Sequence, residues 1–368
     1  MGVILKVLEV KREDLEYNIG LIKKRAKGTR IIAVVKGNGY GLGLKELSKI
    51  LIKNGISDLA VSSVEEALEL ASFKLNARIL CLEATAVQEE IEKLIEKNII
   101  LSIGSKECAE NVTTIAVKLD KIAHCHIAID TGFSRYGFLV SEKEKILEIV
   151  KNSKRIFFDG AFSHLSTAYF QNDFYVRKQY NSFLEVKKYL ESNGIKIPIY
   201  HICNSSAFLK YEDMYLDAVR IGSVFSGRIS VKNNIGLKKV GMLKSNVVEI
   251  KEIKKGTPVG YSNSEVVKKD TKIAIIPVGY SDGFNLEVVD DTYKFVDKIR
   301  RTKNSFTSIF KDVKNKVIIN GDSFEIIGKV GMNHLTVDVT GKDVKINDEV
   351  LLNIKPILVN SKIRREYI

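Results

Sequence analysis

The sequence has few cysteines, and no arrangement of them builds a site. Four occur among 368 residues and no two form a C-x-x-C pair, so neither a zinc site nor a disulfide framework is indicated. His124 and His126 alternate on one face of a predicted strand without an obvious third ligand, so we expect no metal. Reduced thiols in a cytoplasm are the default. The cysteines are Cys81, Cys108, Cys125 and Cys203.

Long apolar runs are also missing. None approaches the roughly 20 residues needed to cross a bilayer. Residues 1–13 mix charges into their apolar positions, unlike the core of a signal peptide. We therefore expect a soluble, cytoplasmic chain with no membrane partner.

The basic residues are not gathered into segments of one sign. The net charge is +13, but lysines stand beside glutamates, as in residues 89–97 and 141–154. We interpret these as solvated faces that leave some positive field for anionic ligands, and expect no nucleic-acid partner. With 45% hydrophobic and 28% charged residues, a chain of this length should form two globular domains.

Residues 31–43, I-I-A-V-V-K-G-N-G-Y-G-L-G, are the most informative segment. The first five predict a strand buried on both faces, and the four glycines after Lys36 permit a tight turn. Desolvation at such a strand end lowers the pKa of a lysine amine, which can then form a Schiff base. The alternative is a lysine that extends its amine to water. No lysine followed by serine or threonine closes the turn, so it is not a phosphate-binding loop.

Up to about residue 227, short β-rich runs alternate with amphipathic helical segments. Eight strands with helices between them predict an α/β fold, a closed (β/α)8 barrel of the TIM type over residues 9–229, with its site at the carboxyl ends of the strands. The predicted strands are 31–35, 59–62, 78–82, 99–103, 123–129, 157–163, 199–202 and 218–221.

The last third of the chain has a different pattern. Short strands with turn signals and few helices predict a β-rich C-terminal domain over residues 236–368. Residues 286–314 are polar and basic, and we interpret them as a surface insertion. The predicted strands are 243–253, 272–277, 315–319, 324–327 and 335–339.

Eight motifs, in order and spaced along nearly the whole chain, resemble the alanine racemase family of pyridoxal phosphate (PLP) enzymes. The first, K-G-N-G-Y-G-L-G, is similar to the family hallmark K-A-N-A-Y-G-H-G. The resemblance implies that an N-terminal strand within residues 1–8 joins the C-terminal domain. The motifs lie at residues 36–43, 129–138, 163–168, 201–207, 219–223, 259–264, 278–283 and 330–334.

The resemblance also implies a cofactor site. Lys36 would bind PLP as an imine, and Arg220 would face the pyridine nitrogen with His201 behind it. Tyr40, Ser205 and the backbone near Gly222 would hold the phosphate. The full set of implied cofactor residues is Lys36, Tyr40, His164, His201, Ser205, Arg220, Gly222 and Ser223.

An arginine at the pyridine nitrogen has a chemical consequence. Because arginine is always protonated, it disfavours a second positive charge there, and the ring is a weaker electron sink than one paired with a carboxylate. A short-lived carbanion favours racemisation over transamination and argues against the related barrel decarboxylases. Outside the V-R-I-G motif, Arg220 would be interpreted as an ordinary strand-end ion pair.

Racemisation needs an acid/base group on each face of the substrate. The resemblance assigns Lys36 to one face and Tyr261 to the other, with His164 hydrogen-bonded to the tyrosine. Since an unperturbed tyrosine has a pKa of about 10, cationic neighbours must lower it for base catalysis. In the family a homodimer supplies such a tyrosine from the second subunit. The implied substrate contacts are Arg135, Tyr280 and the backbone near Met332.

Four positions depart from the family pattern. Ala128 replaces a carbamylated lysine that orients the substrate arginine, Leu42 replaces a histidine, and Asn333 replaces an aspartate. Ser361 occupies the position of a tyrosine, where a small polar side chain enlarges the pocket and favours a substrate hydroxyl. We therefore predict racemisation of alanine with appreciable activity on serine.

Other functions remain open. A racemase of a basic amino acid, such as ornithine or lysine, would need an acidic or open distal pocket. A non-catalytic PLP carrier typically has the barrel alone, which the second domain argues against. A nucleic-acid-binding role rests on net charge only. The physiological expectation from the family is D-alanine supply for the cell wall.

Overall fold

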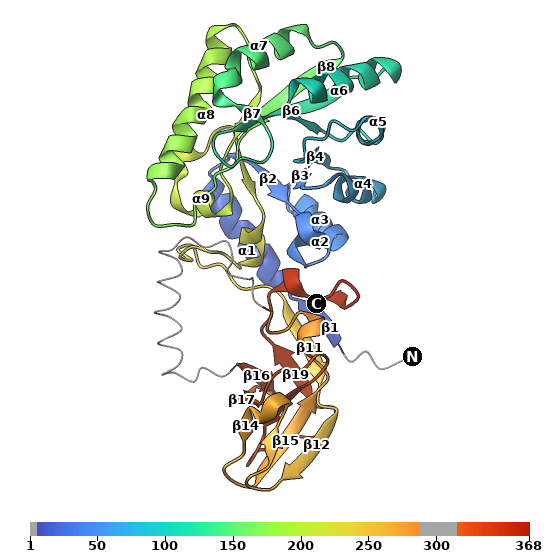
Figure 1. Cartoon of the computed structure of the whole chain (residues 1–368), viewed down its shortest axis with the longest axis vertical. Helices are drawn as coiled ribbons and strands as arrows, with labels where there is room; N and C mark the ends of the chain where they lie inside the picture. Colours follow the sequence, from blue (N-terminus) through green and yellow to red (C-terminus); the bar gives the residue numbers. More distant parts are fainter. Residues whose placement is uncertain (1–5, 287–314) are drawn as a thin grey trace. The chain divides into compact units, whose positions relative to one another are not determined.

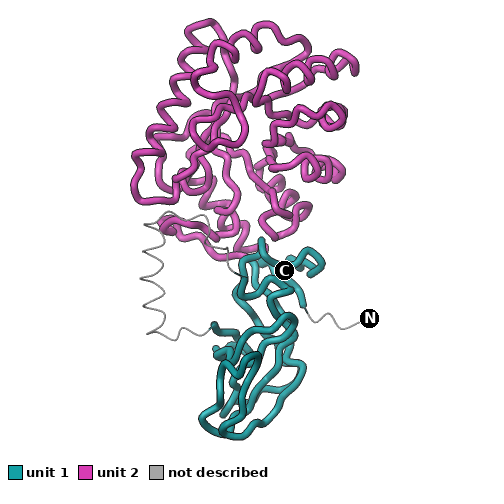
Figure 2. Tube along the Cα trace, viewed as in Figure 1, with its two compact units in different colours: residues 1–11, 241–368 teal, residues 12–240 magenta. Residues whose placement is uncertain are grey.

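The computed structural model describes residues 6–286 and 315–368. The chain forms two compact units, residues 12–240 and residues 1–11 with 241–368 (Figure 2), here called the barrel unit and the β unit. The domain boundaries given above, at residues 8/9 and 229/236, stay a prediction. The predicted surface insertion lies outside the described residues, apart from Leu286.

Eight parallel strands form the barrel, which confirms the predicted fold class. Their order is β4-β3-β2-β10-β9-β8-β6-β5, and an isolated parallel bridge from Leu80 to Ile100 joins β4 to β5. Buried aliphatic side chains such as Ile32 and Val34 fill the interior. The strands are β2(Arg30–Val34), β3(Asp58–Val61), β4(Arg78–Cys81), β5(Leu101–Ile103), β6(Ala123–Asp130), β8(Ile156–Phe162), β9(Ile199–His201) and β10(Ala218–Ile221).

Helices surround these strands (Figure 1). Each longer helix turns an apolar stripe inward, as α3 does with Leu44, Leu47 and Leu51. No helix in the described parts of the chain is both long and apolar enough to span a membrane. The helices are α1(Arg12–Ala26), α2(Lys36–Tyr40), α3(Leu44–Lys53), α4(Val64–Ser72), α5(Gln88–Glu96), α6(Lys106–Lys118), α7(Lys143–Asn152), α8(Phe174–Ser192) and α9(Ser205–Lys210). Short 3₁₀ turns are η1(Val140–Glu142), η2(Glu212–Met214), η3(Ser223–Ser226), η4(Tyr261–Asn263), η5(Tyr280–Asp282) and η6(Pro356–Leu358).

The β unit is built on one sheet in the order β12-β15-β18-β17-β16-β19-β11-β1-β20. The first strand of the chain, β1(Lys6–Val10), lies between β11 and β20, so both ends of the sequence contribute to this unit. The other strands are β11(Met242–Asn246), β12(Glu249–Ile253), β15(Thr271–Ile276), β16(Lys316–Ile319), β17(Asp322–Ile327), β18(Leu335–Asp338), β19(Glu349–Leu352) and β20(Arg364–Tyr367), with β13(Pro258–Val259) and β14(Glu265–Val266) as a separate pair.

Two strand predictions need correction. The predicted strand 243–253 is two strands, because β11 pairs with β1 and β19 whereas β12 pairs with β15. In β6, a register irregularity between Cys125 and His126 separates the two histidines expected on one face. His124 has a half-exposed side chain beside Asp159, whereas His126 is buried. The strands β13, β14, β19, β20 and the short β7(Phe138–Leu139) were not predicted from the sequence.

Candidate functional site

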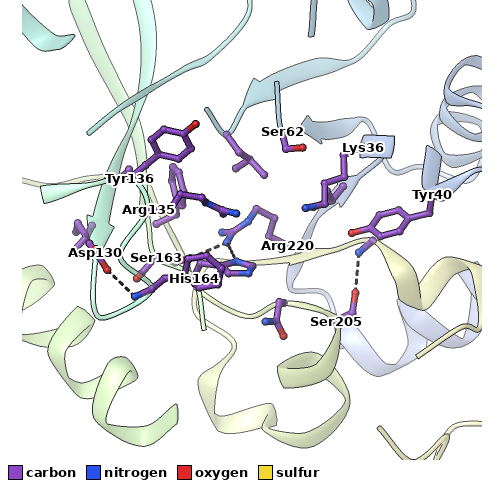
Figure 3. Close-up of a pocket in the computed structure, with 18 residues that line it drawn as sticks. Lys36, Tyr40, Ser62, Asp130, Arg135, Tyr136, Ser163, His164, Ser205 and Arg220 are labelled. Carbon is purple, nitrogen blue, oxygen red and sulfur yellow. Dashed lines mark hydrogen bonds between the residues drawn. The ribbon is translucent and has the colours of Figure 1, made fainter. Parts of the chain in front are cut away.

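A cavity of about 250 Å³ opens at the carboxyl ends of the barrel strands (Figure 3). Its polar wall carries the amine of Lys36 and the guanidinium groups of Arg135 and Arg220. A cavity with two guanidinium groups and an amine is suited to an anionic ligand. The lining residues are Val34, Lys36, Tyr40, Ser62, Leu82, Ala128, Ile129, Asp130, Phe133, Arg135, Tyr136, Phe162, Ser163, His164, Asn204, Ser205, Arg220 and Gly222.

Lys36 begins a left-handed turn one residue after the end of β2, with Val35 between them. Gly37, Asn38, Gly39 and Tyr40 have φ values of 61°, 52°, 64° and 53°, and the Gly41 N–H closes the turn on the Gly37 carbonyl at 2.8 Å. Glycine enters this region without the steric cost that a Cβ imposes. The turn directs the Lys36 amine into the cavity, with the Tyr40 ring beside it (Figure 3).

The electrostatics of the cavity favour a neutral Lys36 amine. Burial lowers the pKa of Lys36, and the nearby Arg135 and Arg220 lower it further, while Glu66 opposes them. Burial raises the pKa of Tyr40 to about 12, so its hydroxyl stays protonated and can donate a hydrogen bond. These are the protonation states that imine formation and anion binding require.

Arg220 is 4% exposed and is held by two histidines. Its guanidinium donates to Nδ1 of His201 at 2.7 Å, to Nδ1 of His164 at 3.1 Å and to the Ser163 carbonyl at 2.8 Å. Burial, together with the charge of Arg220, lowers the pKa of His164 to about 3 and that of His201 well below its usual value. Both rings are therefore neutral acceptors, and Arg220 carries the charge.

Behind His201, a third histidine, His126, extends this series of hydrogen-bonded side chains. His126 Nδ1 and His201 Nε2 are 2.9 Å apart. Since Arg220 can only donate, the neutral His201 carries its proton on Nε2 and donates it to His126. His201 thus lies behind the cavity, in contact with Arg220 rather than in the lining.

Tyr40, Ser205 and Gly222 form a small cradle on the opposite side from Arg135. The Gly222 N–H donates to Ser205 Oγ at 3.0 Å. A Cβ on Gly222 would lie 2.3 Å from Tyr40 Cε2 and 2.6 Å from its hydroxyl oxygen, so only glycine fits. The hydroxyls of Tyr40 and Ser205 can both donate to a phosphate. Ser223, predicted with this group, begins η3 and does not line the cavity.

Arg135 lies on the loop after β6. Its guanidinium carbon is 4.6 Å from the Phe133 ring centroid and 5.8 Å from that of Tyr136. Asp130 Oδ1 accepts from the N–H groups of Gly132, Phe133 and Ser134, which fixes the loop. With Ala128 beneath, aromatic faces orient this arginine in place of a lysine.

The remaining predicted site residues belong to the β unit. Tyr261, Tyr280 and Met332 are 70%, 44% and 53% exposed. The Tyr280 N–H donates to the Gly331 carbonyl at 3.1 Å, and the Ser281 N–H donates to the Met332 carbonyl at 3.0 Å. Tyr280 and Met332 are thereby brought together within the β unit.

Several lining residues were not predicted, although strand ends could have indicated them. Ser62 follows β3, Leu82 follows β4 and Ser163 follows β8. Each stands one residue past a strand, where barrel sites are assembled. The other missed side chains that define the cavity are Asp130, Phe133, Tyr136 and Asn204.

Comparison with known proteins covers both units. Residues 10–230 match the family described as "Alanine racemase, N-terminal domain" and residues 240–361 match "Alanine racemase, C-terminal domain". The chain is 36% identical over 351 residues to an alanine racemase of Clostridium tetani, which covers 94% of this chain and 84% of that protein. It is 33% identical over 350 residues to one of Methanococcus maripaludis, with 91% and 87% covered. A solved alanine racemase of Clostridium difficile 630 matches with a TM-score of 0.87 at 27% identity, over 100% of this chain and 97% of that one.

Proposed function

Since this chain belongs to the alanine racemase family, we propose that it is a PLP-dependent isomerase that interconverts L- and D-alanine. The resemblance inferred from the motifs is thereby confirmed. The observation that carries the proposal is the convergence of Lys36 and Arg220 on one cavity, with the cradle of Tyr40, Ser205 and Gly222 beside them.

The residues present fit PLP. Lys36 would hold its aldehyde carbon covalently, and Arg220 would donate to its ring nitrogen while His201 and His164 hold the guanidinium. The cradle would take the phosphate, because a side chain at Gly222 would fill that space. When bound, the cofactor withdraws electrons from the substrate α-carbon and so acidifies its proton.

The proton transfers fall to the chain's own side chains. A Lys36 amine with a lowered pKa can accept the α-proton on one face of the substrate and return it. We assign the other face to the Tyr261 hydroxyl, with Tyr280 and the Met332 backbone at the substrate. Arg135, held over Phe133, would bind the substrate carboxylate.

The assignment of Tyr261 leads to the oligomeric state. We propose a homodimer in which Tyr261, Tyr280 and Met332 of one subunit complete the cavity of the other. The support is that the structure leaves these three side chains exposed on the β unit, where a second subunit can reach them. The proposed location is the cytoplasm, supported by four buried free cysteines.

Alanine is the favoured substrate, with serine as a second. The cavity volume of about 250 Å³ and the small Ala128 side chain suit a short substrate. Ser361 is exposed on the β unit beside Asn360, which donates to the Ser281 carbonyl at 3.2 Å. A basic amino acid is less favoured, because the guanidinium groups of Arg135 and Arg220 would repel its side-chain charge.

One experiment tests the proposal. The full chain with PLP is incubated with L-alanine, L-serine and L-ornithine in deuterated water, and D-isomer and α-deuterium are followed for the wild type, Lys36→Ala and Tyr261→Phe. We expect alanine to turn over fastest and both variants to lose at least roughly 100-fold in kcat. Negligible turnover of alanine and serine would refute the function.

Mixed dimers test separately whether Tyr261 acts in the site of the other subunit. Lys36→Ala and Tyr261→Phe chains, each inactive, should regain up to about a quarter of wild-type activity when exchanged, because some mixed dimers contain one complete site. If subunit exchange is verified and no activity returns, Tyr261 does not act in trans.

A further inference from the structure

Glu66 lies beside the turn that carries Lys36. It is the third residue of α4, where the Glu66 N–H donates to the hydroxyl of the capping residue Ser63 at 3.3 Å. The spacing S-x-x-E is that of a capping box, in which the glutamate carboxylate returns to the backbone N–H of the capping serine. In this chain the carboxylate makes different contacts.

The Glu66 carboxylate connects the ends of two neighbouring barrel strands. Oε1 accepts from the Gly37 N–H at 2.5 Å, and Oε2 accepts from the Ser62 N–H at 3.4 Å. Gly37 is the residue after Lys36 and the first of the left-handed turn. A hydrogen bond from backbone to an ionised carboxylate is stronger than one to a neutral acceptor, so Glu66 holds the peptide on which the direction of Lys36 depends.

Glu66 also supplies charge. The other groups that face Lys36 are Arg135, Arg220, the neutral His164 and the protonated Tyr40. The two arginines disfavour a proton on the lysine, whereas Glu66 favours one. Among these described groups, Glu66 is the anionic one, so its removal leaves Lys36 among cations and neutral rings.

We propose that Glu66 is a positioning residue for Lys36: its carboxylate fixes the first peptide of the turn and places a negative charge near a lysine that otherwise faces cations. The proposal rests on the proposed function only for the identity of Lys36 as the reacting amine. It implies that Glu66 raises the pH at which Lys36 changes from donor to acceptor of a proton.

Three variants separate the effect of the Glu66 carboxylate on the position of the turn from the effect of its charge on Lys36. Glu66→Gln keeps an oxygen acceptor for Gly37 and removes the charge, and Glu66→Ala removes both. Glu65→Gln changes the exposed neighbour on the same helix and is the matched control. All are full-length chains freed of cofactor with hydroxylamine, with folding checked by thermal unfolding.

Two measurements follow, neither of which depends on activity. Competitive acetylation between about pH 6 and pH 11, read by mass spectrometry at Lys36, gives the titration of the amine. The rate of hydrogen exchange at the Gly37 amide shows whether the first peptide of the turn is still held in place. In Glu66→Gln, Lys36 should titrate at lower pH and be labelled roughly threefold faster near neutrality, with Gly37 still protected. Glu66→Ala should show the same titration and an exchange rate at Gly37 that rises about tenfold.

The outcomes are distinct. A wild-type Lys36 titration in Glu66→Gln, or unchanged Gly37 exchange in Glu66→Ala, overturns the role of Glu66, as does an equal effect from Glu65→Gln. Borohydride trapping of PLP on Lys36→Ala provides the separate control. If Lys36→Ala no longer traps PLP, the proposed function stands whatever the result for the Glu66 variants. If Lys36→Ala still traps PLP fully, at another lysine, the proposed function itself is refuted.

Discussion

The guanidinium of Arg220 donates to Nδ1 of His201 over 2.7 Å, with both side chains buried. This bond fixes the tautomer of His201, whose Nε2–H then faces His126 Nδ1 at 2.9 Å. The neutral rings of His201 and His126 thus support the charged Arg220 through a series of hydrogen bonds. As a consequence, neither buried histidine can accept a proton without breaking that series.

Acid should therefore destabilise the protein through these rings. Burial, with nearby arginines, lowers the pKa of His126 to about 3, so the folded ring stays neutral between pH 6.5 and 3 while the unfolded one takes up a proton. Stability is complete above the unfolded pKa and falls as pH drops, by about 1.4 kcal/mol per pH unit for each such ring. His126→Gln keeps an acceptor for His201 but cannot titrate, so its unfolding free energy should decline less steeply between about pH 6.5 and pH 5.

Urea unfolding at several pH values checks this prediction. His334 is exposed in the β unit, and His334→Gln serves as the control, with the wild-type pH dependence expected. If His126→Gln and the wild type lose stability in parallel as pH falls, the buried ring does not contribute.

Gly222 offers a steric test of the cradle. Its φ of −140° is negative, so no left-handed backbone conformation opposes a side chain there. The Cβ of Gly222→Ala would collide with the Tyr40 ring, which would have to move. We expect the unfolding free energy to fall by about 1–3 kcal/mol and the affinity for PLP to fall about tenfold or more, measured by chemical unfolding and by absorbance titration.

Gly20 provides the matched substitution. It lies in α1, and apart from its neighbours and the backbone of its own helix, no atom of the described residues lies within 4 Å of the position that a Cβ would occupy there. Gly20→Ala should therefore raise stability by about 0.5–1 kcal/mol and leave PLP affinity unchanged. Equal PLP affinity in Gly222→Ala and the wild type would contradict the cradle.

Much of the barrel could be predicted because its strands are short apolar runs bounded by turn residues. The predicted strand 218–221 coincides with β10, and the others lie within about two residues of the observed ones. Lys36 was found because the predicted strand ends at it, whereas Arg220 was assigned through the V-R-I-G motif of the family resemblance. Strand pairing, which no local pattern encodes, decided where the predicted strand 243–253 divides.

Contacts between distant residues could not be predicted. Glu66 belongs to a local capping pattern, and its bond to Gly37 depends on how β2 and β3 align. Phe133 orients Arg135 through a loop conformation that Asp130 sets. Asn18 is similar, because its partners are more than 200 residues away.

Asn18 gives a prediction about stability. It is fully buried in α1, where its amide donates to the Phe225 and Lys238 carbonyls at 2.9 and 2.8 Å and accepts from the Lys238 N–H at 2.8 Å. Asn18→Leu would remove the partner of three backbone groups, at up to about 1–3 kcal/mol for each that is buried. Because only the Phe225 carbonyl bond is fully buried and the two Lys238 bonds are partly buried, thermal and urea unfolding should show a loss of about 2 kcal/mol or more. The exposed Asn152→Leu should change stability by less than about 0.5 kcal/mol, and an equally mild Asn18→Leu would refute the account.

For Tyr200 we expect the opposite effect, a substitution that raises the free energy of unfolding. Its side chain is 1% exposed, and its buried hydroxyl has no hydrogen-bond partner in the described residues. Because an unpaired buried polar group costs stability, Tyr200→Phe should raise the unfolding free energy by about 1 kcal/mol. In Tyr215 the hydroxyl donates to the Phe208 carbonyl, so Tyr215→Phe should lower it by a similar amount. Urea unfolding of both variants tests this prediction. If Tyr200→Phe is destabilised as much as Tyr215→Phe, the Tyr200 hydroxyl is hydrogen-bonded in solution, most simply to a buried water.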